Sequence, residues 1–341
     1  MRVAIAHHDR LVRQALRRAL SRTEFEIAWQ VDDFEPLERR SSEEPPELLL
    51  AELDLLGPRA ERLPALLANG CAIIVLASAS AVGAGFEALG LGALALLAPP
   101  TLDENGELHG AARFVDRLQR FASLARANQT NTAVTATATA TQIPDGLPPL
   151  IALGASTGGP LALATILGSL SVECPAAVLV VQHIESDFVG GFAQWLGTRC
   201  ALPVSVAKRG TTPRAGHVYV AASTHHLVLL PSHQFGGLMP QPGDVHVPSV
   251  DALFRSLAQN APPGIAALLT GMGADGVEGL LVLRQSGWHT LAQDQASSVV
   301  YGMPRAAAAR GAVVRTLPLE RIGAELMTAL SMSATARGRK K

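Results

Sequence analysis

Three polar residues beyond residue 150 have the chemical types and the sequence surroundings that a hydrolytic site needs, and the first is a serine. Ser156 lies in the run Gly154-Ala-Ser-Thr-Gly158, which fits the G-x-S-x-G pattern of a sharp turn between a strand and a helix. The amides that open such a helix can stabilise an oxyanion. The pattern is also typical of phosphate-binding turns, although neither a P-loop lysine nor G-x-G-x-x-G accompanies it.

A histidine and an aspartate complete the candidate set, because a serine hydroxyl needs a base to become a nucleophile. His183 ends the apolar run Ala176–Gln182, a predicted strand whose carboxyl end should share a rim with Ser156. Asp275 follows the apolar run that begins at Ile265, in a glycine-rich loop before a predicted helix. Asp275 can be the N-cap of that helix, or it can orient His183. The chain order Ser, His, Asp differs from that of α/β-hydrolases and excludes their fold.

The chain is long enough to predict two domains. Its 341 residues exceed the roughly 250–300 at which one core stops growing. The segment 127–149 is rich in threonine and alanine, has no helical apolar stripe, and predicts a flexible linker. We therefore expect domains at 1–126 and 150–330, followed by a basic tail at 331–341.

Both domains predict the α/β class, with doubly wound parallel sheets. Short apolar runs alternate with helical patterns in the first domain, which predicts five buried strands. Ligands of such sheets bind beyond the carboxyl ends of the strands, so functional residues are expected at those ends. The predicted strands are Val3–Ala6, Phe25–Val31, Leu48–Ala51, Cys71–Leu76 and Ala93–Leu97.

The strand ends of the first domain resemble those of a response-regulator receiver. The resemblance covers about residues 1–120 and rests on the frames Pro46–Glu52 and Leu91–Pro100. A receiver carries an acidic pair for Mg²⁺, a phosphate-accepting aspartate, a Ser or Thr and a lysine. The matching positions here hold His7, His8, Glu52, Ala77 and Pro99. This implies a pseudo-receiver that does not take up a phosphoryl group, since imidazoles are poor ligands for Mg²⁺.

Two alternatives remain for the first domain. It can be a flavodoxin-like fold without a regulatory role. His7 and His8 can also bind a transition metal, but adjacent side chains at a strand end point to opposite sides, which disfavours this interpretation. We therefore expect no metal.

Six segments beyond residue 150 carry a more specific resemblance. In order, they are Ile151–Pro160, Val180–Leu196, Pro213–Ala221, Pro248–Phe254, Leu269–Gly276 and Ala292–Pro304. Together these segments resemble the Rossmann-like catalytic domain of the CheB methylesterase family over about residues 148–325. The resemblance implies that Ser156 is the nucleophile, His183 the base and Asp275 its orienting acid. It also implies that Thr157 assists the nucleophile and that Met272 supplies a backbone oxyanion donor.

The same resemblance implies a function. The substrate would be a γ-glutamyl methyl ester on the cytoplasmic domain of a methyl-accepting chemoreceptor, hydrolysed by a protein-glutamate methylesterase without a cofactor. Deamidation of receptor glutamines would follow the same chemistry, and a chemotaxis histidine kinase is a further possible partner. The alternative is a non-catalytic regulatory module that docks on a receptor or signalling protein, for example in a type IV pilus chemosensory pathway.

Composition excludes other classes of function. Lysine and arginine number 28 against 29 acids, so the net charge of −1 attracts neither nucleic acid nor anionic lipid. Three scattered cysteines predict no disulfide framework, which favours a cytoplasmic protein. The uncharged stretch Leu63–Phe86 is interrupted by turn residues, so we expect a buried strand and no membrane insertion. Five histidines fit no metal-ligand spacing, and we expect them at the surface or rim: His217, His225, His226, His233 and His246.

Overall fold

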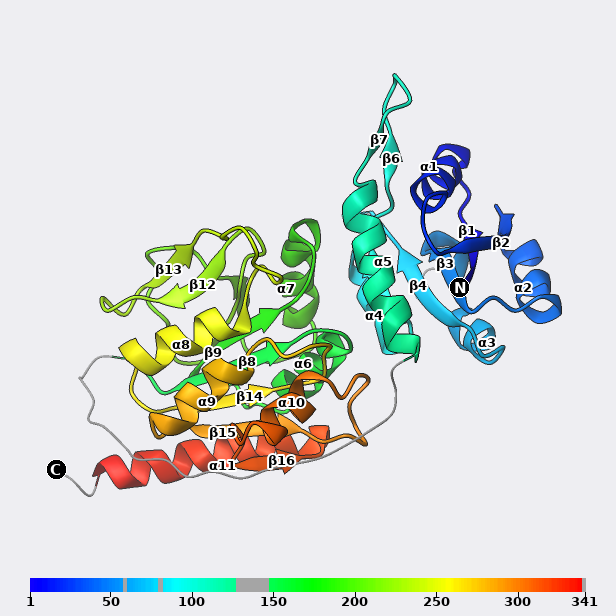
Figure 1. The fold of residues 1–341 in the computed structure, drawn as a ribbon. Coiled ribbons are helices and arrows are strands. Elements are labelled where there is room, and N and C mark those ends of the chain that lie inside the picture. Colours follow the sequence, from blue (N-terminus) through cyan, green and yellow to red (C-terminus); the bar gives the residue numbers. More distant parts are fainter. Residues whose placement is uncertain (58–59, 79–81, 127–146, 339–341) are drawn as a thin grey trace. The chain divides into compact units, whose positions relative to one another are not determined.

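The computed structural model describes residues 1–57, 60–78, 82–126 and 147–338 (Figure 1). The chain divides into two compact units, Met1–Thr130 and Asn131–Lys341. The predicted linker lies outside the described residues except for 147–149. The last helix continues to Gly338, beyond the predicted end of the second domain at residue 330. No helix in the part of the chain that the structure describes is long and apolar enough to cross a membrane.

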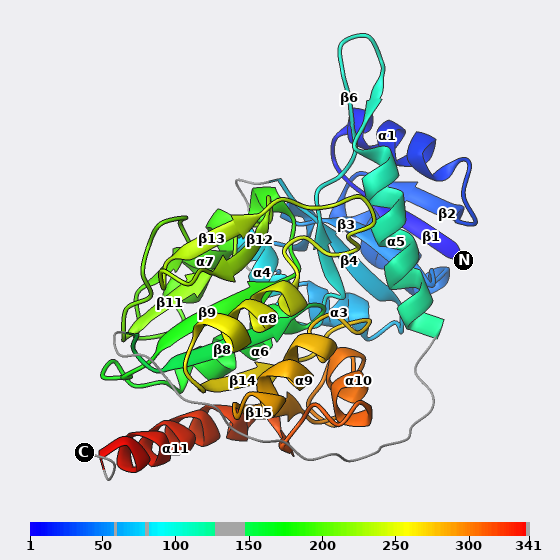
Figure 2. The same cartoon turned by 60° about the vertical axis from the view of Figure 1, so that its left-hand side comes forward.

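The first unit is built on a parallel sheet with the strand order β2-β1-β3-β4-β5, the flavodoxin-like order (Figure 2). The five predicted strands are confirmed within two residues at each end. They are β1 (Arg2–Ala6), β2 (Glu26–Val31), β3 (Leu48–Glu52), β4 (Ala72–Leu76) and β5 (Ala95–Leu97). The helical elements are α1 (Arg10–Leu20), α2 (Phe34–Glu43), η1 (Asp54–Leu56), α3 (Leu63–Leu67), α4 (Val82–Gly90) and α5 (Ala111–Arg126).

Local chemistry explains the start of the first unit. Asp9 caps α1 through its carboxylate and the Leu11 N–H, and Leu16 and Leu20 on the inner side of α1 are fully buried against the sheet. A hairpin of β6 (Thr101–Leu102) and β7 (Leu108–His109) precedes α5 and was not predicted. Strands of two residues carry no alternation that a sequence pattern can reveal.

The second unit contains a seven-stranded parallel sheet with the order β10-β11-β9-β8-β14-β15-β16. The strands are β8 (Leu150–Ala155), β9 (Ala177–Gln182), β10 (Val204–Val206), β11 (His217–Val220), β14 (Ile265–Leu268), β15 (His289–Gln293) and β16 (Arg315–Leu317). A separate antiparallel hairpin joins β12 (His226–Leu229) to β13 (Phe235–Leu238). The predicted α/β class is confirmed for both units.

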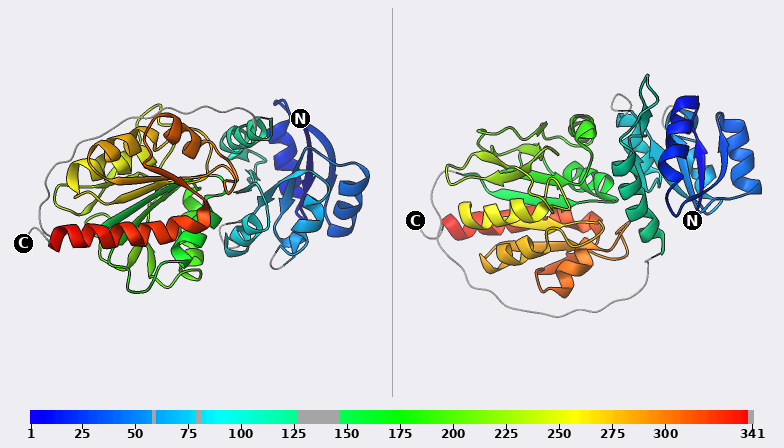
Figure 3. Two further views of the ribbon diagram at one scale, coloured as in Figure 1. Left: turned by 90° about the horizontal axis from the view of Figure 1, so that it is seen from below. Right: turned by 45° about the horizontal axis from the view of Figure 1, so that its top comes forward.

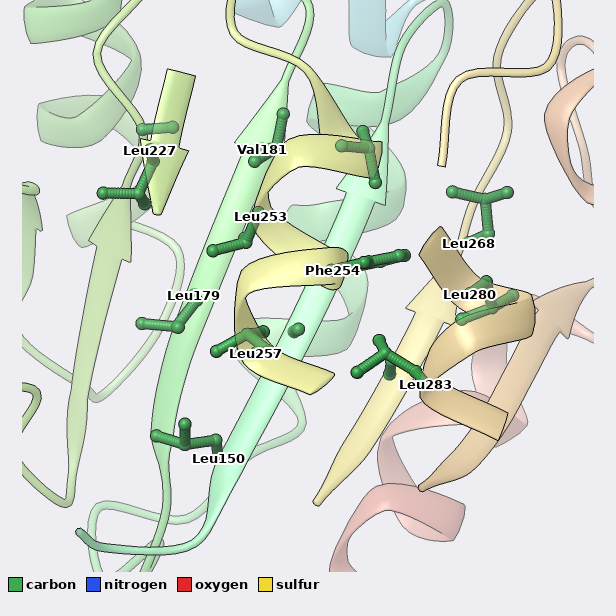
Figure 4. Packing of buried hydrophobic residues seen from close by; sticks show 14 of the residues in the cluster. Leu150, Leu179, Val181, Leu227, Leu253, Phe254, Leu257, Leu268, Leu280 and Leu283 are labelled. Atoms are coloured by element: carbon green, nitrogen blue, oxygen red, sulfur yellow. The ribbon is translucent and has the colours of Figure 1, made fainter. Parts of the chain in front are cut away.

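Helices cover both faces of the second sheet (Figure 3). On one face lie α8 (Val250–Asn260), α9 (Val277–Gln285) and α10 (Met303–Ala309); on the other lie α6 (Gly159–Gly168), α7 (Val189–Gly197) with the short η3 (Ser186–Phe188), and α11 (Leu319–Gly338). Leucines of α8 and α9 pack on the strands beneath them (Figure 4). Burying one leucine contributes about 1.5–3 kcal/mol, so this layer anchors the two helix starts that reach the site.

The order of strands in the second unit indicates where a ligand is expected to bind. β8 is the first strand of this sheet in the chain, and its neighbours β9 and β14 lie on opposite sides of it. The chain thus reverses its direction across the sheet at β8, and in open parallel sheets ligands bind at the carboxyl ends of the strands beside such a point. Ser156, His183 and Asp275 follow these three strands.

Candidate active site

The backbone around Ser156 is fixed from several directions. Its N–H donates to the Thr270 carbonyl at 3.0 Å, and its own carbonyl accepts from the Gly159 N–H at 2.9 Å and from Nε2 of Gln182 at 2.7 Å. Gly158 adopts a φ of 78° at the start of α6, a conformation that a side chain would strain. The turn thus holds the serine side chain at the N-terminus of a ten-residue helix.

His183 lies at the neighbouring strand end and contacts Asp275. The register of β8 and β9 pairs Ala155 with Gln182, so Ser156 and His183 follow at the same level. Nε2 of His183 is 2.8 Å from Oδ2 of Asp275, and the two side chains are only 9% and 7% exposed. Because an ionised carboxylate only accepts hydrogen bonds, Nε2 carries the proton and Nδ1 carries the lone pair.

Nδ1 of His183 is the nitrogen available to act as a base. It is buried and has no hydrogen-bond partner among the described residues, Ser156 included. The structure therefore joins His183 to Asp275 directly, whereas it places Ser156 next to His183 along the rim without a hydrogen bond between them. Hydrogen bonds of catalytic groups are often long before substrate binds and tighten in the complex.

The carboxylate of Asp275 accepts four hydrogen bonds. Besides His183, the Ser249 hydroxyl donates to it at 2.8 Å, the Val250 N–H at 2.7 Å and the Asp251 N–H at 3.1 Å. These donors open α8, whereas the N-cap of α9 is Gly276 and no side chain caps that helix. The interpretation of Asp275 as the N-cap of the following helix was therefore wrong, because the loop turns the carboxylate toward α8 instead.

The surroundings of Asp275 keep it ionised. Burial alone would raise the pKa of this carboxyl group, but the hydrogen bond and charge of His183, together with the amides of Val250 and Asp251, hold the pKa well below its usual range. A carboxylate that stays charged can stabilise the imidazolium that forms when His183 takes a proton.

Thr157 and Met272 are brought to the same rim. The Thr157 carbonyl accepts from the Thr270 hydroxyl at 2.9 Å. Met272 follows Gly271, whose carbonyl accepts from the amides of Gly302 and Met303 at 3.1 and 2.8 Å. Both Thr157 and Met272 are half-buried. The loop that carries Met272 is thus tied down beside the serine turn.

Sequence reasoning missed several supporting residues. Gln182 braces the serine turn, and Ser249 orients Asp275, although a serine before an apolar helix is a recognisable capping signal. The ring of His246 stacks on His183, with ring centroids 4.2 Å apart and planes within 1°. His226 is buried, donates to Asp244 and accepts from the Ser249 N–H. The expectation of surface or rim histidines was therefore wrong for His226, because its two ring nitrogens tie the loop after β13 to the start of α8.

The first unit assembles a separate polar cluster. His7 and His8 follow β1 and Glu52 ends β3, while Ala77 and Pro99 follow β4 and β5 at the same edge of the sheet. The rings of His7 and His8 stack at 5.3 Å, and both approach Glu52. The argument that these rings point to opposite sides was wrong, because β1 ends at Ala6 and the alternation of a strand no longer applies.

Burial favours the neutral form of His7. It lowers the pKa of His7 more than the neighbouring Glu52 carboxylate raises it. Nδ1 of His7 accepts from the Asp9 N–H at 3.0 Å, so that nitrogen carries a lone pair.

The fold and the site together indicate a class of protein. A glycine-flanked serine at the switch point of a parallel sheet, beside a buried histidine–carboxylate pair, is the arrangement of α/β serine hydrolases outside the α/β-hydrolase fold. A family model described as CheB methylesterase matches residues 151–326. The chain belongs to this family.

Similar proteins cover nearly the whole chain. "Protein-glutamate methylesterase/protein-glutamine glutaminase 2" of Cupriavidus metallidurans is 39% identical over 340 residues, which cover 96% of this chain and 98% of that protein. The protein with the same description numbered 4, from Burkholderia thailandensis, is 37% identical over 96% of this chain and 97% of its own length. The crystal structure of the Thermotoga maritima CheB methylesterase catalytic domain has a TM-score of 0.51 and 31% identity, covering 53% of this chain and 98% of that one.

Gly271 provides a test of how closely its loop must approach the serine turn. A Cβ at this position would lie 2.7 Å from Cβ of Ser156 and would also collide with Sδ of Met303. We expect Gly271→Ala to lower esterase turnover about 100-fold, because a displacement of about 1 Å within an active site has that effect. The esterase rate of the purified variant measures this loss, and circular dichroism shows whether the variant is folded.

The control for Gly271→Ala is Gly190→Ala. Gly190 is an exposed helical glycine with nothing within 4 Å of the added carbon. Gly190→Ala should retain the parent rate. Parent-like turnover in Gly271→Ala would show that the loop does not fix the position of Ser156.

Proposed function

We propose that this chain hydrolyses γ-glutamyl methyl esters on the cytoplasmic domain of a methyl-accepting chemoreceptor and deamidates receptor glutamines at the same site. The names of its relatives support the two activities. The observation that carries the proposal is the buried His183–Asp275 pair, whose unpartnered Nδ1 lies at the strand end beside Ser156. The free cysteines, with Cys71 and Cys174 buried, support a cytoplasmic location.

The reaction proceeds through an acyl-enzyme, with Ser156 as the nucleophile and His183 as the base. The Ser156 hydroxyl attacks the ester carbonyl carbon, and its proton passes to Nδ1 of His183. The oxyanion is held by backbone amides at the start of α6 and at Met272, with Thr157 assisting at the serine turn. When the tetrahedral intermediate collapses, methanol leaves with the proton from His183. Water then attacks the γ-glutamyl-enzyme, again through His183, and releases the glutamate; in deamidation, ammonia leaves in place of methanol.

Methanol release from methylated receptor membranes tests the proposal. The parent chain should release methanol from receptors that carry radiolabelled methyl esters, and ammonia from receptors with unmodified glutamines. A purified, folded parent that binds these membranes but releases neither product would favour the alternative of a non-catalytic docking module.

The first unit should act without phosphorylation. Receivers transfer a phosphoryl group with Mg²⁺ held by an acidic pair, whereas here His7 and His8 occupy those positions, and Glu52 is bonded to the backbone N–H of His8 at 2.8 Å. Ala77 and Pro99 supply neither a hydroxyl nor an ammonium. We expect acetyl phosphate with Mg²⁺ to leave both the intact mass of the chain and its rate of methanol release unchanged.

The control for that prediction is a receiver with an acidic site under the same conditions, which should gain the mass of one phosphoryl group. A Mg²⁺-dependent phosphoryl group on residues 1–126 of this chain would contradict the prediction.

A further inference from the structure

We propose that His7, His8 and Glu52 form a binding site for a transition-metal ion of the zinc class. The two histidines follow β1, and Glu52 ends β3, the strand that pairs with β1. One nitrogen from each imidazole and one carboxylate oxygen all lie within 4.8 Å of one another. His7 and Glu52 are buried and His8 is exposed, so the cluster rests on the core and opens to solvent on one side.

The contact between His7 and Glu52 already has the spacing of two ligands of one ion. Nδ1 of His7 lies 3.5 Å from a carboxylate oxygen of Glu52. Two ligands at about 2.0–2.2 Å from a tetrahedral zinc ion are about 3.4 Å apart. Because Nδ1 of His7 accepts the Asp9 N–H, no proton lies between this nitrogen and the carboxylate. Nδ1 has one lone pair in the plane of the ring, so a cation bound there would displace the Asp9 N–H and bridge this nitrogen to the Glu52 carboxylate.

His8 has the freedom to complete the site. Its Nδ1 is 2.6 Å from a Glu52 oxygen, a hydrogen-bond distance that must lengthen by about 0.8 Å when a metal ion replaces the proton. The side chain is 63% exposed, so this movement need not disturb the core. A fourth position, on the solvent side, remains for water.

The donor set selects the class of ion. Two imidazole nitrogens and one carboxylate suit Zn²⁺, Co²⁺, Ni²⁺ and Cu²⁺, whereas Mg²⁺ requires oxygen ligands in an octahedron. Two histidines, one carboxylate and an open position are also the ligands of one group of zinc sites. The residues thus do not fit the Mg²⁺ of the receivers that this unit resembles, but they do fit a softer ion at the same edge.

A second group in the described residues provides the comparison. Asp103, Glu107 and His109 also lie close enough to hold an ion, but all three are exposed. Asp103 already accepts the amides of Asn105 and Glu107 and so serves the turn between β6 and β7. Nothing beyond this local structure points to a ligand there.

Cobalt and zinc binding to the full chain tests the proposal. The chain is stripped with a chelator, desalted, and titrated with Co²⁺ while the visible absorption is followed; Zn²⁺ is then measured by competition with a chromophoric chelator. We expect one ion per chain, a spectrum of tetrahedral or five-coordinate Co²⁺, and no displacement by a large excess of Mg²⁺. Loss of an outer-shell partner weakens metal sites by about 10–100-fold, so His8→Ala, which removes a ligand, should weaken binding by about 100-fold or more.

His109→Ala is the matched control and should bind like the parent. His8→Ala removes an exposed side chain, and unchanged circular dichroism would confirm that its fold is intact. The proposal is overturned if the parent binds no Co²⁺ or Zn²⁺, if His8→Ala and Glu52→Gln both bind like the parent, or if His109→Ala loses the ion. The readout is binding, so it does not depend on ester hydrolysis by the second unit.

Discussion

Methanol release from methylated receptor membranes is expected to fall by a factor of at least about 10⁴ when Ser156 is replaced by alanine. Removing the nucleophile of a serine hydrolase leaves only the contributions of the oxyanion site and of substrate binding. The hydrogen bonds that shape the serine turn are made by the backbone of Ser156, to Thr270, Gly159 and Gln182. Ser156→Ala should therefore keep the turn and the fold while it removes the reacting atom.

Two measurements separate loss of chemistry from loss of structure. In the acid-quenched and digested parent, the peptide that contains Ser156 should be esterified to a receptor peptide through its glutamate side chain, and the variant should show no such adduct. Ser171→Ala, at an exposed serine of a turn, should release methanol at the parent rate. A Ser156→Ala protein that retains a tenth of the parent activity would show that another residue attacks the ester.

The elements that carry the site could be predicted from sequence because their signals are local. Each of the three strands is predicted by an apolar run, and glycines follow the runs before Ser156 and Asp275 and allow tight turns there. Ser156 and His183 then follow from one rule, that the carboxyl ends of parallel strands share an edge. The five strands of the first unit were confirmed for the same reason.

The contacts that orient the site could not be predicted, because they join residues far apart in the chain. Asp275 meets Ser249 across 26 residues and His183 across 92. An aspartate in a glycine-rich loop before a helix is a local signal for a cap, and only the packing of α8 against α9 shows which helix it serves. The stack of His246 on His183 likewise depends on the path of the loop after β13, which no periodicity encodes.

The cluster in the first unit shows where a local rule fails. Alternation of side chains holds only while the backbone is extended, and β1 ends one residue before His7. Beyond that point the chain bends toward the Asp9 cap of α1, and both imidazoles turn to Glu52. His7 and His8 lie beyond the end of β1, so the alternation of side chains along a strand does not apply to them.

Asp275→Asn is expected to lower turnover by about 10³–10⁴-fold. Four donors face this carboxylate: His183 and Val250 at Oδ2, and Ser249 and Asp251 at Oδ1. An asparagine must turn its NH₂ group toward one pair of these donors. If the NH₂ group faces His183, Nε2 must accept a hydrogen bond, so the ring proton moves to Nδ1 and the base is lost. If the NH₂ group faces Ser249, α8 loses part of its cap and His183 has no charge beside it.

The same substitution should change how stability depends on pH. The folded-state pKa of Asp275 lies below the unfolded value near 3.9, so its stabilisation is fully present above about pH 4 and is lost as the pH falls toward the folded-state pKa. At pH 7, leaving a buried donor of this carboxylate without its acceptor costs about 1–3 kcal/mol. Urea midpoints of parent and Asp275→Asn should therefore differ most at neutral pH and converge in acid.

Asp251→Asn is the matched control for Asp275→Asn. Asp251 is a second carboxylate at the start of α8, and its Oδ1 accepts from the Gly279 N–H at 2.6 Å. Asparagine keeps an oxygen for that amide, and no hydrogen bond joins Asp251 to His183 in the described residues, so turnover should stay within about tenfold of the parent. If both variants lost activity equally, the role of Asp275 would be to hold α8 in place. A selective loss in Asp275→Asn, with a midpoint gap that closes in acid, would instead come from its charge on His183.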